Sequence, residues 1–295
     1  MLGVVNLDKP VGPTSHDMVA LLRRLSGTRR IGHAGTLDPL ASGVLPILVG
    51  AATRFSEELT GGDKHYQALV RLGMRSATDD AQGPITAGGP PPSDDEIGRA
   101  LAGFVGTQLQ RPPSFSARKQ DGEVAHRAAR AGSPIELPAR TVRVEAIELL
   151  GVTRAEAWAD VEVRIRCGPG TYIRSIARDL GERLGCGGYL ASLRRTKTAG
   201  LDVAGAFTPD RLIDLAAAGR LGEAILPVAS LLPLPPLTLD DAEASRFAHG
   251  SVVKVTAPVG SGPHAVFRGQ LLLGIGTLSG GMLQPDKVIA PQELP

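Results

Sequence analysis

The chain has 295 residues, of which 42% are hydrophobic and 21% charged, and its formal net charge is +2. These values are typical of globular proteins, so they argue against a disordered chain and allow about two domains. The two cysteines, Cys167 and Cys186, are too few for a disulfide framework, so we expect buried thiols and a reducing compartment.

The first residues, MLGVVNLDKPVG, contain no basic segment followed by an apolar core, so they do not resemble a signal peptide. No uninterrupted apolar run approaches the roughly 20 residues that span a bilayer. We therefore expect a cytoplasmic protein with no membrane partner.

Basic residues gather in two stretches of the chain although the net charge is small. Residues 107–143 contain seven basic and three acidic residues, and residues 164–197 contain eight basic and two acidic residues. The guanidinium fork matches phosphate oxygens, so this pattern suits a nucleic-acid backbone. Ordinary solvated faces would give the same pattern, and charge alone leaves both interpretations open.

The first half of the chain is predicted to contain both strands and helices. Apolar alternation predicts strands, and apolar spacing at 3.6 residues with capping residues predicts helices. The expected strands are residues 3–10 and 65–74, and residues 44–55 are expected to be a strand or a buried apolar segment. The expected helices are residues 16–27 and 94–106. Thr14 or Ser15 caps the first helix, and Ser93 with Glu96 forms a capping box for the second. A polar, turn-rich excursion occupies residues 76–93.

The second half predicts two strands, a helix and a separate small module. The strands are residues 140–152 and 157–167, and the helix is residues 173–185. Strands that alternate with helices indicate an α/β or α+β core on a mixed sheet. Proline density at residues 226–237 marks a linker, and the short β-runs beyond it predict a small β-barrel suited to binding.

The sequence lacks several motifs that would indicate cofactor or metal chemistry. It has no P-loop, no G-x-G-x-x-G after a strand, no H-E-x-x-H and no C-x-x-C. The six histidines and two cysteines are scattered rather than spaced as metal ligands. We therefore expect no metal and no cofactor.

Residues 32–46, GHAGTLDPLASGVLP, form a constrained loop around one carboxylate. Pro39 disfavours the α-region at Asp38 and removes a neighbouring backbone donor. The three glycines of the segment let the backbone bend and let another molecule approach closely. Asp38 is either a nucleophile or general base, or the acceptor of an Asx-turn that holds the loop.

The segment GPGTYIRS, residues 168–175, connects a predicted strand to a predicted helix. Tyr172 and Arg174 therefore lie at a helix N-terminus beside glycines. That position suits anion binding, or an arginine held against a carboxylate from elsewhere. The alternative is a tyrosine that packs under the turn.

Tyr66 stands at the start of a predicted strand, and aromatic residues make up only 3% of the chain. A ring that stacks on a nucleic-acid base contributes about 1–3 kcal/mol per base. Simple core packing is the alternative for a single tyrosine.

With these segments in view, the chain resembles the TruB family, the bacterial tRNA pseudouridine-55 synthases. VNLDKPVGPTS followed by GHAGTLDPLASGVLP is similar to the two N-terminal motifs of that family. The similarity continues through the segments DKHYQALVRLG, PPSFSARKQDGEVAHRAARAG and GPGTYIRSIARDLGERLGCGGYLASLRRT. The C-terminal β-module resembles a PUA domain, so the resemblance covers nearly the whole chain.

The resemblance implies that a uridine in the T loop of tRNA is flipped out and isomerised to pseudouridine without cofactor or metal. Asp38 matches the nucleophile, which attacks C6 of the base or C1′ of the sugar, and Arg174 matches the arginine that pairs with it. Tyr66 matches the tyrosine that stacks on the flipped base and is implicated in proton removal. His33 matches the histidine that fills the space left by the base. Two further residues match positions that line the uracil pocket: Tyr172 and Leu193.

The resemblance also implies an organisation. We expect an α+β catalytic domain on a mixed sheet at residues 1–230, with an RNA-binding insert around residues 76–140, and a PUA-like barrel at residues 236–292. Two departures affect RNA contacts. His126 stands where the family often has tyrosine, and SATDD replaces a threonine-rich T-x-T-x-D loop.

Two other functions remain to be weighed. A non-catalytic tRNA-binding or tRNA-folding protein would keep the basic stretches but could lose Asp38. The guide-RNA-dependent relatives act with partner proteins, whereas the insert PSFSARKQDG and the small C-terminal module favour a stand-alone enzyme. We expect a monomer that binds the T stem-loop without guide RNA, since no heptad or exposed apolar helix argues otherwise.

Overall fold

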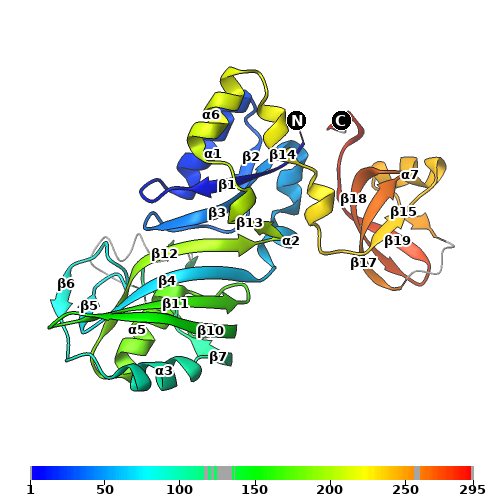
Figure 1. Ribbon diagram of the computed structural model, residues 1–295. Coiled ribbons are helices and arrows are strands. Elements are labelled where there is room, and N and C mark those ends of the chain that lie inside the picture. Colours follow the sequence, from blue (N-terminus) through cyan, green and yellow to red (C-terminus); the bar gives the residue numbers. More distant parts are fainter. Residues whose placement is uncertain are drawn as a thin grey trace.

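A mixed β-sheet forms the centre of the larger part of the molecule (Figure 1). The computed structural model describes residues 2–115, 119–120, 123–124, 135, 137–255 and 260–293. The strands of this sheet are β1 (Gly3–Lys9), β2 (Ile31–His33), β3 (Ala41–Val49), β4 (Lys64–Leu72), β7 (Gly106–Gln110), β10 (Arg140–Arg154), β11 (Ala159–Cys167), β12 (Gly188–Thr198), β13 (Leu201–Asp202) and β14 (Ile225–Leu226).

The strand order explains why segments distant in sequence meet at one place. Neighbours follow the order β14-β1-β3-β12-β4-β11-β10-β7, with β2 beside β3 and β13 beside β12. β12 runs parallel to β3 and antiparallel to β4. The prediction of a mixed sheet in an α+β fold is therefore confirmed. β12, which belongs to the last segment that resembles the family, therefore lies between β3 and β4. The loop with Asp38 precedes β3, and β4 carries Tyr66.

Helices flank the sheet along its length (Figure 1). They are α1 (Ser15–Ser26), α2 (Ser56–Thr60), α3 (Asp94–Ala102), α5 (Ile173–Arg183) and α6 (Pro209–Ala217). α1 packs on α6 near β1, whereas α3 contacts β10 and α5 contacts β12 and β4. Apolar residues of α1, α3, α5 and α6 join those of the sheet in one buried cluster, which holds these elements in place by removing apolar surface from water.

The two predicted helix starts are confirmed at their caps. Thr14, rather than Ser15, caps α1, where its side chain and that of Asp17 form a capping box. Ser93 and Glu96 form the capping box of α3, as the sequence predicts. These reciprocal bonds satisfy backbone N–H groups that have no partner inside the helix.

Residues 44–55, expected as a strand or a buried apolar segment, are a strand only in their first half. β3 ends at Val49, and Gly50–Phe55 form a 3-10 helix that starts at Gly50 with φ +65°. A positive φ is readily available to glycine, so the strand turns there. The predicted helix at residues 94–106 is also too long, because α3 ends at Ala102 and β7 begins at Gly106.

The turn-rich excursion contains a small antiparallel pair. β5 (Met74–Ser76) pairs with β6 (Ile85–Ala87), and β8 (Lys119–Gln120) pairs with β9 (Glu123–Val124) further along the chain. His126 and the basic residues Arg118, Arg127 and Arg130 lie outside the described residues. The expected contacts of His126 are therefore left as a prediction, as is the part of the insert around them.

The C-terminal module is a separate sheet with one short helix. Its strands are β15 (Pro236–Thr238), β16 (Val253–Lys254), β17 (Gly262–Arg268), β18 (Leu271–Ser279) and β19 (Met282–Val288), and its helix is α7 (Asp241–Ala248). They follow the order β15-β17-β18-β19-β16. Between the described residues of the two end strands, β15 and β16, no pairing closes the sheet, so the expected barrel is seen only in part.

The module docks on the larger part of the molecule through apolar and charged contacts. Leu272 and Ile275 of β18 belong to the same buried cluster as Phe55 and Leu48. The Lys287 ammonium donates to the carboxylates of Glu57 and Glu58, and Glu293 pairs with Arg30 and Arg54. The proline-rich segment predicted as a linker is packed as well, since Val228 and Leu232 are buried in this cluster. None of the helices in the described ranges has the length and hydropathy needed to cross a membrane.

Candidate active site

The loop between β2 and β3 carries Asp38 and is held by the N-terminal segment. The backbone N–H of Leu37 donates to Ser15 Oγ at 2.9 Å, and Ser15 Oγ donates to the Leu37 carbonyl at 3.0 Å. The Gly12 N–H donates to the Pro39 carbonyl at 2.8 Å. These bonds fix the backbone on both sides of Asp38. Its carboxylate is directed to an arginine from another element, which favours the displayed carboxylate over the Asx-turn.

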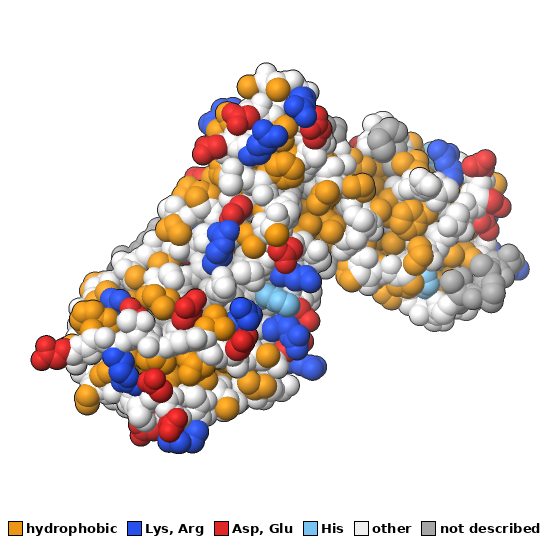
Figure 2. Space-filling view, in the orientation of Figure 1, with side chains coloured by type: hydrophobic (Ala, Val, Ile, Leu, Met, Phe, Trp, Pro, Cys, Tyr) orange, Lys and Arg blue, Asp and Glu red, His pale blue; other side chains and the backbone are white. Residues whose placement is uncertain are grey.

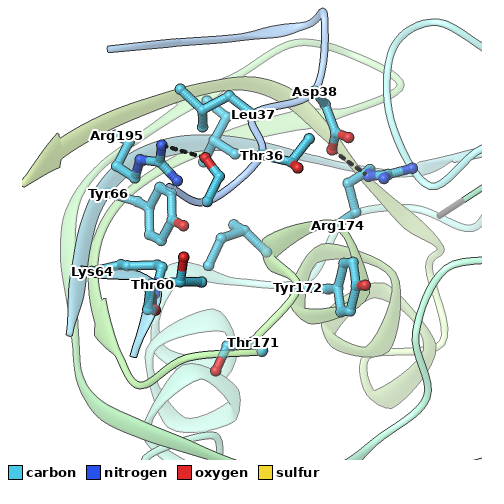
Figure 3. A pocket seen from close by; sticks show the side chains of 14 residues that line it. Thr36, Leu37, Asp38, Thr60, Lys64, Tyr66, Thr171, Tyr172, Arg174 and Arg195 are labelled. Carbon is cyan, nitrogen blue, oxygen red and sulfur yellow. Dashed lines mark hydrogen bonds and ion pairs between the residues drawn. The ribbon is translucent and has the colours of Figure 1, made fainter. Parts of the chain in front are cut away.

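That arginine is Arg174, in the first turn of α5 (Figure 3). Its Nε lies 3.0 Å from Asp38 Oδ2, and the orientation makes the contact an ion pair rather than a well-aligned hydrogen bond. Its Nη2 donates to the Phe115 carbonyl at 3.0 Å. The guanidinium is 5% exposed, so the ion pair is little screened by solvent. The pairing of Arg174 with a carboxylate from elsewhere matches the prediction.

A second carboxylate, which the sequence did not identify as part of a site, faces the same arginine. Asp80 Oδ2 lies 3.5 Å from Arg174 Nη1, and the side chain is 5% exposed. Asp80 accepts from Thr78 Oγ1 at 2.6 Å and from the Gln82 N–H at 3.0 Å. These bonds hold Asp80 in the SATDD turn, so Arg174 lies between two carboxylates.

The charge state of Asp38 reflects opposing effects. Burial raises the pKa of Asp38 above its usual value, and Asp80 raises it further, while Arg174 and Lys9 lower it. The side chain is 38% exposed at the pocket mouth, and the pocket walls desolvate the carboxylate. Arg174 therefore keeps the pKa lower than burial alone would make it.

Asp38 and Arg174 open onto a cavity of about 290 Å³ (Figure 3). This volume is near the lower limit of about 300 Å³ found for small-molecule pockets. Three other predicted residues line the same cavity: Tyr66, Tyr172 and Leu193. The structure thus brings together five of the six predicted site residues, from α5, β4, β12 and the loop before β3.

Tyr66 and Leu193 reach the cavity from adjacent strands. Leu193 on β12 pairs with Ala68 on β4 and with Ala41 on β3. Tyr66 is two residues before Ala68, so both side chains leave the sheet on one face. Tyr66 is 6% exposed, and burial raises the pKa of its hydroxyl while Arg195 lowers it.

Tyr172 is the N-cap residue of α5, and Gln110 holds its backbone. The Tyr172 N–H donates to Gln110 Oε1 at 2.8 Å, and Gln110 Nε2 donates to the Tyr172 carbonyl at 3.1 Å. Because the side chain of Gln110 at the end of β7 satisfies the backbone, the phenol ring is left to line the cavity. This arrangement favours a pocket role over packing under the turn.

His33 lies apart from the cavity, beside a neighbouring one. That second cavity is about 340 Å³ and shares Thr60 with the first. The His33 ring lies edge-on to His16 with centroids 5.5 Å apart, and its Nδ1 is buried with no hydrogen-bond partner among the described residues. Burial, His16 and Arg195 lower the pKa of His33, so the imidazole is neutral at pH 7.

Two lysines that the sequence did not single out lie beneath the site. Lys9 is fully buried and donates to the carbonyls of Pro10 and Pro13 at 2.8 and 2.9 Å. Burial lowers the pKa of Lys9 to about 8. Lys64 donates to the carbonyls of Thr60 and Gly62, and burial lowers its pKa as well. Both lie in segments of the resemblance, but only the fold shows that they are buried.

The second basic stretch, residues 164–197, is largely neutralised by ion pairs. Arginines and acids are interspersed on the face shown in Figure 2. The pairs are Arg164–Glu148, Arg166–Glu145, Arg178–Asp79, Arg178–Asp179 and Arg194–Asp8. Charge patterning in this stretch is therefore weaker evidence for phosphate binding than the sequence suggests.

Comparisons with known proteins identify the family of the chain. Residues 23–173 match the family model for the TruB family pseudouridylate synthase N-terminal domain, and residues 174–233 match that for the tRNA pseudouridylate synthase B C-terminal domain. The chain is 40% identical over 299 residues to a tRNA pseudouridine synthase B of Ralstonia pickettii (strain 12J), covering 97% of this chain and 94% of the relative. It is 41% identical over 297 residues to a tRNA pseudouridine synthase B of Burkholderia mallei (strain NCTC 10247), covering 97% and 96%.

Two solved structures share the fold. One is a Cbf5-Nop10-Gar1 complex, with a TM-score of 0.75, 28% identity, and coverage of 99% of this chain and 86% of that chain. The other is an H/ACA RNP bound to a substrate RNA containing 2'-deoxyuridine, with a TM-score of 0.75, 28% identity, and coverage of 100% and 87%. Both similarities extend over the mixed sheet and the C-terminal module together.

Proposed function

The chain belongs to the TruB family of pseudouridylate synthases, and we propose that its Asp38 pocket isomerises a uridine in the T loop of tRNA. It is a tRNA pseudouridine synthase, an isomerase. The reaction breaks the N1–C1′ bond of one uridine and joins C5 of the same base to C1′. The modified position is uridine 55, as the family resemblance implies.

The observation that carries this proposal is the Asp38–Arg174 ion pair of 3.0 Å at the mouth of the cavity. Asp38 is the nucleophile and attacks C6 of the base or C1′ of the sugar. Arg174 lowers the pKa of this carboxylate against the effect of burial. Asp80 holds the other side of the guanidinium and so aims it at Asp38.

The pocket accepts one base at a time. A base stacked in the T loop must be extruded before the reaction, which costs a few kcal/mol. Tyr66 stacks on the extruded base, while Tyr172 and Leu193 line the space around it. The neutral His33 ring, in the adjoining cavity, occupies the place that the base leaves. These contacts offset the cost of extrusion.

Tyr66 receives the proton that the isomerisation releases. Once C5 has joined C1′, the C5–H bond breaks, its electron pair restores the C5–C6 double bond, and Tyr66 in its phenolate form takes the proton. N1 gains one proton for the one that C5 loses. No net proton is consumed, and no metal or cofactor takes part in these steps.

The remaining parts of the chain position the tRNA. We assign the catalytic domain to residues 1–230, an RNA-binding insert to residues around 76–140, and a PUA-like RNA-binding domain to residues 236–292. The protein acts as a cytoplasmic monomer. Size-exclusion chromatography with light scattering tests the monomer, and the loss of tRNA affinity on deleting residues 236–292 tests the module.

The enzyme acts without a guide RNA. Curated relatives named tRNA pseudouridine synthase B are about 40% identical to it, whereas the chains in the H/ACA complexes are 28% identical. The test is purified protein with an unmodified tRNA transcript and no other RNA. Pseudouridine in the T loop, mapped by carbodiimide primer extension, supports the proposal. Activity that appears only with added guide RNA and partner proteins contradicts it.

A further inference from the structure

Arg195, which the sequence assigns only to a basic stretch, is a buried cation at the wall of the pocket. It is 1% exposed. Its Nε donates to the Val44 carbonyl at 2.8 Å and its Nη2 to the Gly35 carbonyl at 3.0 Å. Among the described residues no carboxylate lies within ion-pair distance of it. A buried charge without a counter-charge is costly, so its presence here calls for an anion that forms at this place.

The titratable side chain next to Arg195 across the sheet is Tyr66. The two residues are direct cross-strand partners, Arg195 on β12 and Tyr66 on β4. Directly opposite side chains on an antiparallel pair lie on the same face. Both side chains line the same cavity (Figure 3), and Arg195 lowers the pKa of the Tyr66 hydroxyl.

Strand β3, on the other side of β12 from β4, fixes the position of Arg195. Arg195 is also the partner of Gly43 on β3. A Cβ at position 43 would lie 2.1 Å from the Arg195 carbonyl oxygen, and Gly43 has φ +103°, so only glycine allows the two strands this approach. Directly after Arg195, the pairing of β12 with β4 contains a bulge between Arg195 and Lys197. The bulge bends β12 and so separates Arg195 from the exposed end of the strand.

The charges around Tyr66 act in opposite directions. Burial raises the pKa of Tyr66, and the Cys167 and Asp38 side chains raise it further. Arg195 is the group that lowers it. Lys64 faces Arg195 from the start of β4. The Cys167 thiol has a pKa raised to about 11 by burial, so it is neutral at pH 7 and provides no counter-charge.

We propose that Arg195 is a positioning residue that stabilises the phenolate of Tyr66 and orients its oxygen for proton transfer from C5. This inference rests on the proposed function, because it gives the proton acceptor of that reaction its counter-charge. Arg174 then interacts with the carboxylate of Asp38, and Arg195 with the phenolate of Tyr66. The carbonyl contacts to Val44 and Gly35 aim the guanidinium at Tyr66.

The first test needs no substrate, so it is independent of the proposed function. The protein is labelled with 3-fluorotyrosine, and the resonances of its three tyrosines are assigned with Tyr66→Phe and Tyr172→Phe. In Arg195→Gln the titration of Tyr66 moves to higher pH by about 1 unit or more. Arg194→Gln, at the adjacent position that pairs with Asp8, leaves the titration of Tyr66 unchanged. An unchanged Tyr66 titration in Arg195→Gln overturns the inference.

The second test separates charge from simple structural support. Fluorination makes a phenol more acidic, so incorporation of difluorotyrosine into Arg195→Gln restores much of the single-turnover rate that this variant has lost. The same label changes the rate of the wild-type protein less. Arg195→Lys keeps the positive charge, so it retains a higher single-turnover rate than Arg195→Gln. If loss of the carbonyl contacts impairs folding of Arg195→Gln, Arg195→Lys is used in its place. An equal response of wild type and variant to fluorination contradicts the inference. Wild-type protein that makes no pseudouridine contradicts the proposed function instead.

Discussion

Ser15 and Leu37 exchange two hydrogen bonds, one from the Leu37 N–H at 2.9 Å and one to the Leu37 carbonyl at 3.0 Å. Ser15 is the first residue of α1, and Leu37 precedes Asp38. Ser15 is 2% exposed, so water does not replace these bonds when they are lost. The N-terminal segment thereby holds the loop that presents the carboxylate.

We predict that Ser15→Ala destabilises the protein by about 1–3 kcal/mol, because it leaves the Leu37 backbone groups buried and unsatisfied. The loop then holds Asp38 less firmly, so the single-turnover rate also falls. Urea unfolding and rapid-quench assays measure the two effects. Ser230→Ala is the control, since the exposed Ser230 hydroxyl bonds only the nearby Pro227 carbonyl. Equal stability of the two variants would count against this role.

The two neighbours of Asp38 should shift the acid limb of the pH–rate profile in opposite directions. Asp38 must be ionised to attack, so that limb follows its pKa. Arg174 lowers the pKa of Asp38 and Asp80 raises it. Arg174→Gln therefore moves the limb to higher pH and costs about 100-fold or more in rate. Asp80→Asn moves the limb to lower pH.

Single-turnover rates measured between about pH 4 and 8 distinguish these shifts, because the usual pKa of aspartate is about 3.9 and burial raises it. Binding of tRNA is measured in parallel. A loss confined to affinity in Arg174→Gln would make Arg174 a phosphate contact. Shifts in the same direction for both variants would contradict the charge assignment around Asp38.

Lys9 predicts a pH dependence of stability. Its pKa is about 8 in the folded protein and 10.5 when unperturbed, so between these values the unfolded chain binds more protons. Stability linked to Lys9 therefore rises with pH in that window. Relative to Lys9→Met, the wild type gains up to about 3 kcal/mol from pH 8 to above pH 10. Urea unfolding of both proteins measures the difference, and a constant difference would contradict the prediction.

Docking of the C-terminal module should depend on apolar contacts more than on charge. Partly exposed ion pairs contribute about 0–1 kcal/mol each and weaken with salt. We therefore expect the module to stay docked in the double variant Lys287→Ala, Glu293→Ala. It also stays docked in 1 M salt, where the Debye length is about 3 Å. Leu272→Asp releases it, because Leu272 is packed against the catalytic part. The module's own core, with Phe247 and Val253, is a separate cluster.

Small-angle X-ray scattering and limited proteolysis at residues 226–236 measure the docking. We expect an increased radius of gyration and rapid cleavage for Leu272→Asp alone. Release of the double variant at low salt would show that the ion pairs, and not the apolar cluster, hold the module.

Apart from the family resemblance, the residues that could be identified from sequence were those whose surroundings are local. Asp38 is followed directly by Pro39, and Thr14 caps α1 together with Asp17, three residues later. Both features could therefore be predicted from neighbouring residues. Asp80 was not identified, because its role depends on Arg174, which is distant in sequence and reaches it only through the fold.

Arg195 shows the same limit more sharply. Arg194 and Arg195 are adjacent in a basic stretch, yet Arg194 pairs with Asp8 at 39% exposure and Arg195 is buried at 1%. A strand directs successive side chains to opposite faces, and only the register of β12 decides which arginine points inward. The sequence analysis did not predict β12 itself, since its arginines and lysine obscure the apolar pattern of a central strand.

The most direct measurement is pseudouridine formation by Asp38→Asn on an unmodified tRNA transcript, mapped in the T loop and compared with tRNA affinity. The substitution removes the charge and keeps the size of the side chain. We predict that pseudouridine formation is abolished while affinity is retained, and that Asp95→Asn, on the exposed side of α3, behaves as wild type. Pseudouridine formation at the wild-type rate in Asp38→Asn would show that Asp38 is not the nucleophile.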